Sequence, residues 1–262
     1  PDLCYNRKEN HLNRAGLPAL QANEKRENAM SAQNLTLLTD LYELTMMQGY
    51  FETQENETVI FDVFFRENPN KGGYSIMAGL EQVIEYIKNL HFSYEDVDYL
   101  RKLGIFSEDF LHYLSGFHFS GNIYAIPEGT VIFPKEPIIK VIAPIMEAQL
   151  VETAILNIIN HQCLIATKTA RVVFAAQGDG IMEFGLRRAQ GPDAGLYGAR
   201  AAMIGGCVGT SNVLAGKMFN VPVMGTHAHS WIMSFKDEYT AFKEYARLYP
   251  DSCTLLVDTS DT

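Results

Sequence analysis

The residues best suited to chemistry lie between Ile181 and Ser234. Two adjacent arginines, Arg187 and Arg188, follow the short apolar run IMEF. A hydroxyl-rich turn, Gly209-Thr-Ser-Asn212, comes next, followed by the histidine-bearing segment Thr226-His-Ala-His-Ser230. Guanidinium groups bind phosphates and carboxylates as paired donors, and the start of a helix also favours an anion. This constellation predicts a site for an anionic, phosphorylated substrate.

Short strands and helices alternate along this stretch. The runs IMEF, CVGT and VPVMGT have the length and bounding glycines of buried strands, and helices are predicted over 193–204 and 211–219. Such alternation indicates a parallel sheet with crossover helices, open or closed into a barrel. Ligands bind at the carboxyl ends of such strands. We therefore expect His229 to face Arg187 and Phe184 across a shared hollow.

The residues alone leave two chemistries open for the pair His227 and His229. Alternate side chains of a strand point to the same side, so the pair could clamp a metal ion in a hydrolase. That reading lacks later histidines, and Asp258 is the only acid at a later strand end. The other reading is an imidazole that accepts a phosphoryl group or holds a phosphate-bearing substrate. Phe184, next to the end of its strand, could stack on a flat ring or be a core residue.

The rest of the chain predicts an accompanying α/β layer. Helices are expected over 41–51, 75–90, 95–102, 108–114 and 237–248, and 146–176 is expected to hold two more. Strands are expected over 59–66 and 253–258, and IYAI, TVIF and IIKVIA are expected to form a small antiparallel unit.

Composition narrows the classes of partner. The formal net charge of −10 over 262 residues disfavours nucleic acid or an acidic membrane surface. The sequence has no apolar run near the ~20 residues of a membrane span and starts without a secretory signal. The cysteines Cys4, Cys163, Cys207 and Cys253 are scattered, which is typical of reduced thiols rather than of disulfides or a zinc site. We therefore predict a soluble cytoplasmic protein.

Three segments are predicted. Residues 1–29 are polar and aperiodic, so we interpret them as a disordered or non-native extension, with Met30 as the natural start. An N-terminal α/β domain is expected over 30–144, and a partial α/β-barrel catalytic domain over 145–262. Because the strand and helix series stops soon after its best motif, we expect the chain to be a fragment of a longer protein.

Five motifs together resemble the nicotinate phosphoribosyltransferase family, in that family's order and from about Met30 to the last residue. They are Thr39-Asp-Leu-Tyr-Glu-Leu-Thr-Met46, Glu183-Phe-Gly-Leu-Arg-Arg-Ala-Gln-Gly-Pro-Asp193, Gly209-Thr-Ser-Asn212, Gly225-Thr-His-Ala-His-Ser230 and Leu256-Val-Asp-Thr259. The resemblance implies an irregular (β/α) barrel of the type II phosphoribosyltransferase kind, here incomplete, behind an N-terminal α/β domain.

The resemblance also implies a reaction. Nicotinate and phosphoribosyl pyrophosphate would give nicotinate mononucleotide and pyrophosphate in NAD salvage, driven by ATP hydrolysis with Mg²⁺. His229 resembles the histidine that ATP phosphorylates, with Thr226 and Ser230 beside it in the substrate pocket. Phosphoribosyl transfer passes through a cation-like ribose, so such an enzyme mainly positions two anions and a ring.

Other site residues follow from the same resemblance. Phe184 resembles the aromatic that stacks on the pyridine ring, and Arg187 and Arg188 the cations near carboxylate and phosphates. Ser211 stands where the related nicotinamide enzymes carry an acid, and an uncharged residue there suits a carboxylate. Tyr42 resembles a tyrosine that reaches the neighbouring subunit's site, which implies a head-to-tail homodimer.

The chain departs from this family in its length. Family members are longer, and their later strands carry another substrate arginine and loops that hold the phosphoribosyl phosphate. We therefore expect the 262 residues to have at most vestigial activity. The contrasting hypothesis is an inactive fragment that binds nicotinate poorly or only dimerises, and the metal-dependent hydrolase is a third.

Overall fold

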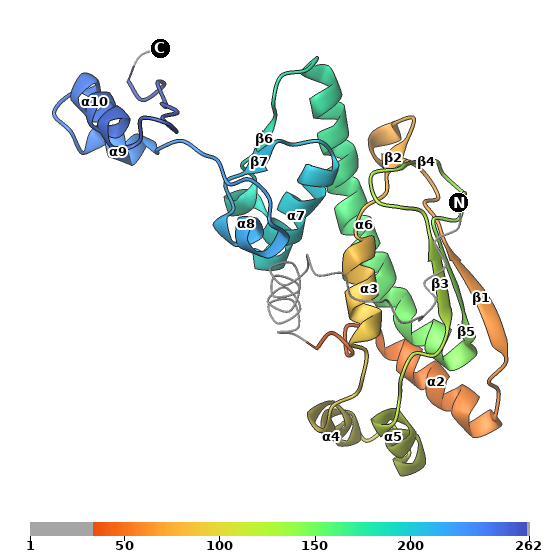
Figure 1. Cartoon of the computed structure of the whole chain (residues 1–262). Coiled ribbons are helices and arrows are strands. Elements are labelled where there is room, and N and C mark those ends of the chain that lie inside the picture. Colours follow the sequence, from red (N-terminus) through yellow and green to blue (C-terminus); the bar gives the residue numbers. More distant parts are fainter. Residues whose placement is uncertain (1–33, 261–262) are drawn as a thin grey trace, which may run out of the picture.

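An antiparallel sheet lying against one long helix organises the first part of the chain (Figure 1). The computed structural model describes residues 34–260, so the extension predicted over 1–29 lies outside the described residues. The sheet has the order β1-β5-β3, and a two-stranded pair β2-β4 lies beside it. These strands are β1 (Thr58–Val63), β2 (Ser75–Ile76), β3 (Asn122–Ala125), β4 (Val131–Ile132) and β5 (Ile139–Pro144). All of their pairings are antiparallel, but the predicted unit of IYAI, TVIF and IIKVIA forms only in part. The first and last of these runs pair as β3 and β5, whereas β4, from TVIF, pairs with β2 in a separate sheet.

The helices lie on one side of this sheet and continue into the second part of the chain (Figure 1). They are α2 (Leu41–Thr53), α3 (Leu80–Lys88), α4 (Tyr94–Lys102), α5 (Glu108–Ser115), α6 (Ile145–Ala175), α7 (Pro192–Ile204), α8 (Val213–Phe219), α9 (His229–Met233) and α10 (Glu238–Leu248), with 3₁₀ turns η1 (Pro69–Lys71) and η2 (Leu186–Arg188). Among the described residues there is no helix of the length and apolarity that a membrane span requires.

Helix α6 holds the two parts together. The sequence predicts two helices over 146–176, but a single helix of 31 residues forms there, about 46 Å long at 1.5 Å per residue. Its first half buries Leu150, Val151 and Ile155 in a continuous core shared with α2–α5 and the sheet. Its second half packs against α7. Because α6 begins at Ile145 and touches both parts, the predicted division at 144/145 stays a prediction.

The helix predicted over 75–90 begins later than expected. Ser75 and Ile76 form β2 and pair with β4, and α3 starts only at Leu80. Gly79 separates the two with φ +102°, where a Cβ would lie 3.1 Å from the Ile158 carbonyl oxygen. The prediction was wrong at this end because the glycine breaks the helical backbone and β4 supplies a distant strand partner.

The second part of the chain contains a short parallel sheet. The strands β6 (Met182–Glu183) and β7 (Gly209–Thr210) pair in parallel, and a parallel bridge joins Thr210 to Val223. Three of the predicted parallel segments therefore lie side by side, with α7 and α8 as the helices between them. A closed barrel is not formed by the described residues.

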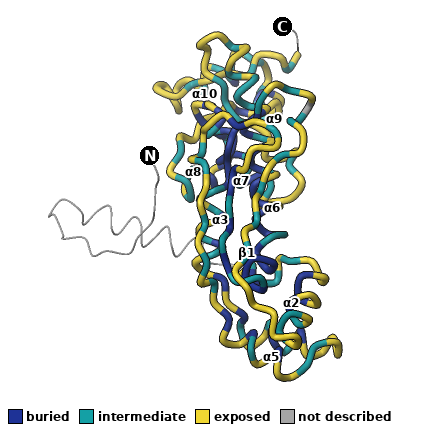
Figure 2. Tube along the Cα trace, turned by 90° about the vertical axis from the view of Figure 1, so that its right-hand side faces the viewer, coloured by how far each residue is buried: buried dark blue, intermediate teal, exposed yellow. Residues whose placement is uncertain are grey.

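The last part of the predicted series has a different structure. Residues 253–258 form no strand, because the Leu256 N–H donates to the ring Nε2 of His227 at 3.2 Å rather than to a neighbouring strand. Helices α9 and α10 lie beyond an extended connection, apart from α7 and α8 (Figure 1). Around α10 the chain is mainly exposed or half-buried (Figure 2).

Candidate functional site

The turn after β6 presents an aromatic ring and two cations. Phe184 follows the last residue of β6 and is 40% exposed, which is high for a phenylalanine. Arg187 and Arg188 lie in η2, and both are exposed. Neither forms an ion pair with any residue between 34 and 260. A flat acid could stack on the ring and meet an uncommitted guanidinium here.

A hydrogen-bond network fixes this turn to β7. Glu183 accepts a hydrogen bond from the Thr210 hydroxyl at 2.6 Å through Oε2 and binds the Gly185 N–H through Oε1. The Glu183 carbonyl accepts the Ser211 N–H at 3.0 Å. Thr210 is fully buried. The ends of β6 and β7 are thus joined at the edge where the sequence predicts the site.

In the turn Gly209-Thr-Ser-Asn212, hydrogen bonds within the turn and to the start of α8 occupy groups that the sequence analysis expected to be available to an anion. Asn212 is buried, and its side-chain oxygen accepts the Ala215 N–H at 3.2 Å as the cap of α8. The backbone N–H of Asn212 donates to the Thr210 hydroxyl oxygen at 3.0 Å. One N–H group that would meet an anion is therefore already paired. Ser211 is half-buried and lies directly between the two networked residues.

The two histidines have different surroundings. His227 is 8% exposed and packs between Phe242 and Tyr245, with ring centroids 5.9 and 4.8 Å away. His229 is exposed at the first residue of α9, with Nδ1 3.1 Å from the Thr259 hydroxyl and Nε2 3.8 Å from an Asp258 oxygen. A shared clamp on one strand is not formed. Among the described residues no group of three or more acids, histidines or cysteines could hold a metal ion.

The predicted site residues fall into three separate places. Phe184, Arg187, Arg188 and Ser211 gather at the ends of β6 and β7. Thr226, Ser230 and His229 belong to the connection and to α9, which lies apart from β6 and β7 (Figure 1). The expectation that His229 faces Arg187 and Phe184 is not met in this structure, because its ring contacts Asp258 and Thr259.

Tyr42 occupies the third place. It lies in the first turn of α2 and is 47% exposed, and α2 lies apart from β6 and β7 (Figure 1). Hydrogen bonding to the Glu43 carboxylate, together with burial, raises the pKa of the Tyr42 phenol. Within one chain Tyr42 therefore does not meet Phe184.

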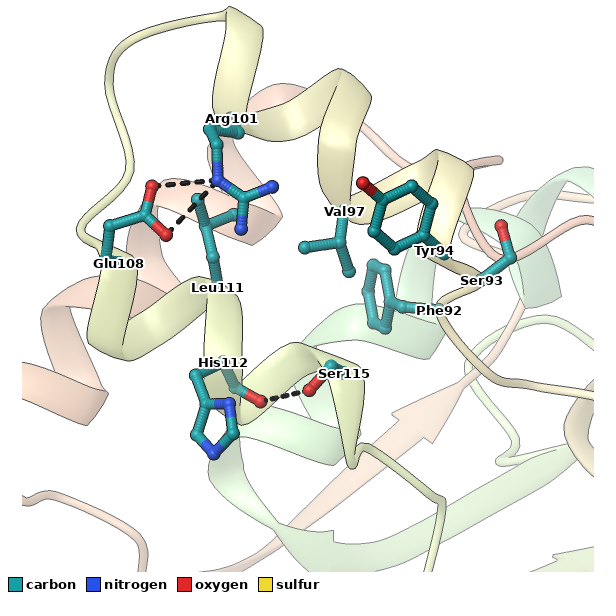
Figure 3. A pocket seen from close by; sticks show the side chains of 9 residues that line it. All are labelled: Phe92, Ser93, Tyr94, Val97, Arg101, Glu108, Leu111, His112 and Ser115. Atoms are coloured by element: carbon teal, nitrogen blue, oxygen red, sulfur yellow. Dashed lines mark hydrogen bonds and ion pairs between the residues drawn. The ribbon is translucent and has the colours of Figure 1, made fainter.

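Two hollows of ligand size lie away from these residues. One of about 400 Å³ lies between α4 and α5, with Phe92, Val97 and Leu111 among its lining and the Arg101–Glu108 ion pair at its rim (Figure 3). Another, of about 350 Å³, lies beside the end of β1 and the middle of α6. Neither is lined by a predicted site residue, so the predicted site is a surface rather than either of these hollows.

Sequence reasoning missed Glu183, which joins the ends of β6 and β7, and the buried Arg200 of α7. Glu183 stands in an apolar strand run, and Arg200 stands in an alanine-rich helix where the apolar face packs. A lone charge in an apolar run is the signal that could have found both, since a charge removed from water needs a partner.

Comparison with known protein families identifies the family of the chain. The profile described as the nicotinate phosphoribosyltransferase N-terminal domain matches residues 37–160, and the one described as the nicotinate phosphoribosyltransferase family matches residues 180–261. The chain belongs to the nicotinate phosphoribosyltransferase family. The matched ranges contain Tyr42 in the first and all the other predicted site residues in the second.

Relatives with the same description come from distant organisms. A nicotinate phosphoribosyltransferase of Mycobacterium tuberculosis is 49% identical over 226 residues, which is 86% of this chain and 49% of the relative. One from Bacillus subtilis is 49% identical over 237 residues, which is 90% of this chain and 48% of the relative. The chain thus spans about half the length of the curated relatives it matches.

Solved structures match the fold. The crystal structure of human nicotinic acid phosphoribosyltransferase aligns with a TM-score of 0.70 and 36% identity over 75% of this chain and 40% of that one. A nicotinate-nucleotide pyrophosphorylase from Pyrococcus furiosus aligns with a TM-score of 0.69 and 26% identity, over 95% and 54%. The mixed α/β fold therefore resembles the structures of this enzyme class, as far as the chain extends.

Proposed function

We propose that this chain carries the nicotinate-binding part of a nicotinate phosphoribosyltransferase. The whole enzyme would transfer the phosphoribosyl group of phosphoribosyl pyrophosphate to the ring nitrogen of nicotinate, releasing pyrophosphate, in NAD salvage in the cytoplasm. The observation that carries the proposal is the exposed Phe184 beside two guanidinium groups that have no ion-pair partner in residues 34–260.

The chemistry of these groups fits the substrate. The pyridine ring would stack on Phe184, and the carboxylate would accept paired hydrogen bonds from Arg187 or Arg188. Ser211 adds no negative charge beside that carboxylate, so the acid is preferred over the amide. The chain has a net charge of −10, so two local cations are the groups that would concentrate an anion here.

His229 would supply the coupling to ATP. Its exposed imidazole is the group that would accept a phosphoryl group from ATP, with Thr226 and Ser230 on either side of it. Mg²⁺ would enter with the phosphates of ATP and phosphoribosyl pyrophosphate, because it binds through few carboxylates and keeps substrate oxygens as ligands. The described residues provide no separate cage for it.

The second aromatic face would come from another copy of the chain. Tyr42 is exposed on α2, which lies apart from β6 within one chain (Figure 1), so a head-to-tail homodimer would bring Tyr42 and Phe184 to the same substrate. Helix α9, which begins at His229, lies apart from β6, which Phe184 follows (Figure 1), so we expect this chain alone to bind nicotinate with little turnover.

Calorimetric titration tests the binding half of the proposal. The chain is titrated with nicotinate and, separately, with nicotinamide, which has the same ring without the carboxylate. We expect nicotinate to bind more tightly, and the double variant Arg187→Ala/Arg188→Ala to lose about tenfold or more in affinity, since a charged hydrogen bond contributes about 1.5–3 kcal/mol.

Two matched variants keep the test specific. Arg247→Ala removes an exposed guanidinium from α10, where it pairs with Glu244 at 2.8 Å, and should leave nicotinate binding unchanged. His229→Ala should also leave it unchanged, because the histidine acts in the ATP step. Equal affinity for acid and amide, or unchanged binding in the double arginine variant, would overturn the proposal.

A further inference from the structure

Arg200 of α7 forms a buried network of hydrogen bonds and ion pairs with the first part of the chain. Arg200 is only 8% exposed. The two terminal nitrogens grip Glu128 through both carboxylate oxygens, at 2.9 Å for Nη1 and 2.7 Å for Nη2. Nη1 also donates to Gln162 Oε1 at 3.0 Å, and Nη2 to Glu81 Oε2 at 2.5 Å. Four hydrogen bonds therefore use both ends of one planar group.

The partners of this guanidinium belong to three different elements. Glu81 lies in the first turn of α3, Gln162 lies in α6, and Glu128 lies between β3 and β4. Glu128 Oε1 also accepts the N–H groups of Gly79 and Leu80, at 2.6 and 3.0 Å, at the start of α3. One side chain thus ties α7 to the helix, the loop and the long helix that define the first part of the chain.

The other end of α7 supports the nicotinate-binding turn. Leu186 of η2 lies so close to Gly195 of α7 that a Cβ there would stand 2.7 Å from its Cδ1. Asn212, the cap of α8, donates its side-chain N–H to the Gly195 carbonyl at 3.2 Å. A shift of α7 would therefore move η2 and the start of α8, which carry Arg187, Arg188 and Ser211.

We propose that Arg200 is a positioning residue of the nicotinate site and acts through α7. This inference rests on the proposed function for its ligand. The guanidinium fixes the position of α7 along its axis and its rotation about that axis, relative to the first part of the chain. Helix α7 in turn holds η2 in place. A lysine cannot replace it, because an ammonium on a flexible stem cannot serve Glu128 bidentately while also reaching Glu81 and Gln162.

The test compares Arg200→Lys with the matched variant Arg101→Lys. Arg101 also pairs with a glutamate, through Nε at 2.8 Å from Glu108, but on the exposed surface of α4. Two readouts are taken well below the melting temperature: the nicotinate Kd by calorimetry, and amide hydrogen exchange over residues 183–192. In Arg200→Lys we expect Kd to rise about tenfold and those amides to exchange about tenfold faster, with neither change in Arg101→Lys.

A merely structural role gives a different pattern. It would lower the melting temperature of Arg200→Lys while leaving the nicotinate Kd of the folded protein and the exchange of 183–192 at wild-type values, and that result would overturn the inference. If Arg200→Lys does not fold, Glu81→Gln takes its place. Glu81 is half exposed, so its loss weakens the grip on Arg200 without leaving that charge alone, and the same two changes are expected in smaller measure.

The two proposals fail in distinguishable ways. If the wild-type chain binds no nicotinate, the proposed function fails, while the exchange measurement still decides whether Arg200 controls residues 183–192. If the wild type binds nicotinate and both readouts are unchanged in Arg200→Lys and Glu81→Gln, the positioning role is refuted and the proposed function stands.

Discussion

The part of the chain that ends with α6 is packed around a larger core than the part that follows α6. Up to residue 175, one continuous core is closed by an antiparallel sheet whose strands pair over six and four residues. After it, paired strands are two residues long, buried clusters are small, and Val213 and Met233 are 71% and 77% exposed. The first part is a completed scaffold, and the second displays chemical groups that this chain does not bring together.

The difference follows from sheet physics. Antiparallel strands can be joined locally and covered on one face, whereas a parallel sheet needs crossover helices and cover on both faces. The parallel segments here have α7 and α8 but few strands beside them. Residues that do chemistry therefore stand on the less completely packed part, and their relative placement depends on braces such as Arg200.

The largest expected effect is a loss of stability in the first part only. Leu150 lies fully buried in α6 within the main core, so Leu150→Ala should lower the free energy of unfolding by about 3–5 kcal/mol through lost burial and a cavity. The exposed Val213→Ala should change it by less than about 0.5 kcal/mol. Urea unfolding followed by far-ultraviolet circular dichroism measures both.

The single tryptophan makes that comparison sharper. Trp231 packs against Phe235 and Tyr245 and donates its ring N–H to the Ala241 carbonyl at 3.1 Å, all within α9, α10 and their connection. Its fluorescence transition should therefore keep its midpoint in Leu150→Ala. If fluorescence and circular dichroism shift together, the two parts unfold as one unit and the contrast drawn above is wrong.

A smaller loss of stability, which depends on pH, is expected when the Glu128–Arg200 ion pair between the two parts is broken. Burial alone would raise the pKa of the Glu128 carboxyl, but the Arg200 guanidinium and the N–H groups of Gly79 and Leu80 outweigh burial and hold that pKa below its usual value. The folded state then binds fewer protons than the unfolded state. The resulting stability is present above the unfolded carboxyl pKa and is lost as pH falls through the lowered folded value.

Glu128→Gln tests that sign. The variant should lose about 3 kcal/mol of stability at pH 7, because the buried Arg200 guanidinium loses its bidentate carboxylate and keeps only Glu81 and Gln162 as partners. Its stability should also decline less steeply than the wild type's between about pH 5 and pH 3. Denaturant melts at a series of pH values measure the slope. An unchanged acid slope would show that Glu128 and Arg200 do not act as an ion pair in the fold.

The next effect concerns ligand choice in the second part. Ser211→Asp places a negative charge beside the nicotinate carboxylate, so Kd for nicotinate should rise about tenfold while nicotinamide binding is unchanged or improved. Ser234→Asp is the control, since Ser234 is exposed at the end of α9. Calorimetry of both ligands decides the matter. A parallel loss in both serine variants would mean that general charge, rather than position 211, sets the preference.

The smallest effect is expected in the scaffold. Tyr86 is buried, and its hydroxyl has no hydrogen-bond partner among the described residues. Burial, and then the Glu43 charge, raise the pKa of this phenol, so it remains protonated. Tyr86→Phe removes an unsatisfied polar group and should stabilise the protein by about 1 kcal/mol. Tyr124→Phe, at a 47% exposed position, is the neutral comparison, and a loss of stability in Tyr86→Phe would reveal a partner for that hydroxyl.

Sequence patterns predict the structure well where neighbours along the chain determine it. Helix α4 follows its prediction closely because Ser93 and Asp96 cap it reciprocally, and α10 follows because Asp237 caps it. The strands β3, β4 and β5 followed from short β-rich runs bounded by glycines and prolines, although β4 pairs with β2 instead of with the other two. The family followed from five motifs in order, which no single motif would have shown.

Contacts between distant residues account for the rest. Ser75 and Ile76 become a strand because β4 pairs with them, and Leu256 leaves the predicted strand because His227 takes its N–H. The brace of Arg200 joins residues from four elements and has no local pattern. The expected meeting of His229 with Phe184 depends on how α9 and α10 sit, and local sequence does not encode that placement.

Radiolabelled nicotinate, incubated with this chain, phosphoribosyl pyrophosphate, ATP and Mg²⁺, tests the central claim most directly, because bound nicotinate and nicotinate mononucleotide are counted in the same sample. The ring and carboxylate groups stand together while His229 stands apart, so the count should show saturable nicotinate on the protein and little or no mononucleotide. Robust formation of mononucleotide by these 262 residues, or no retained nicotinate at all, would contradict the account.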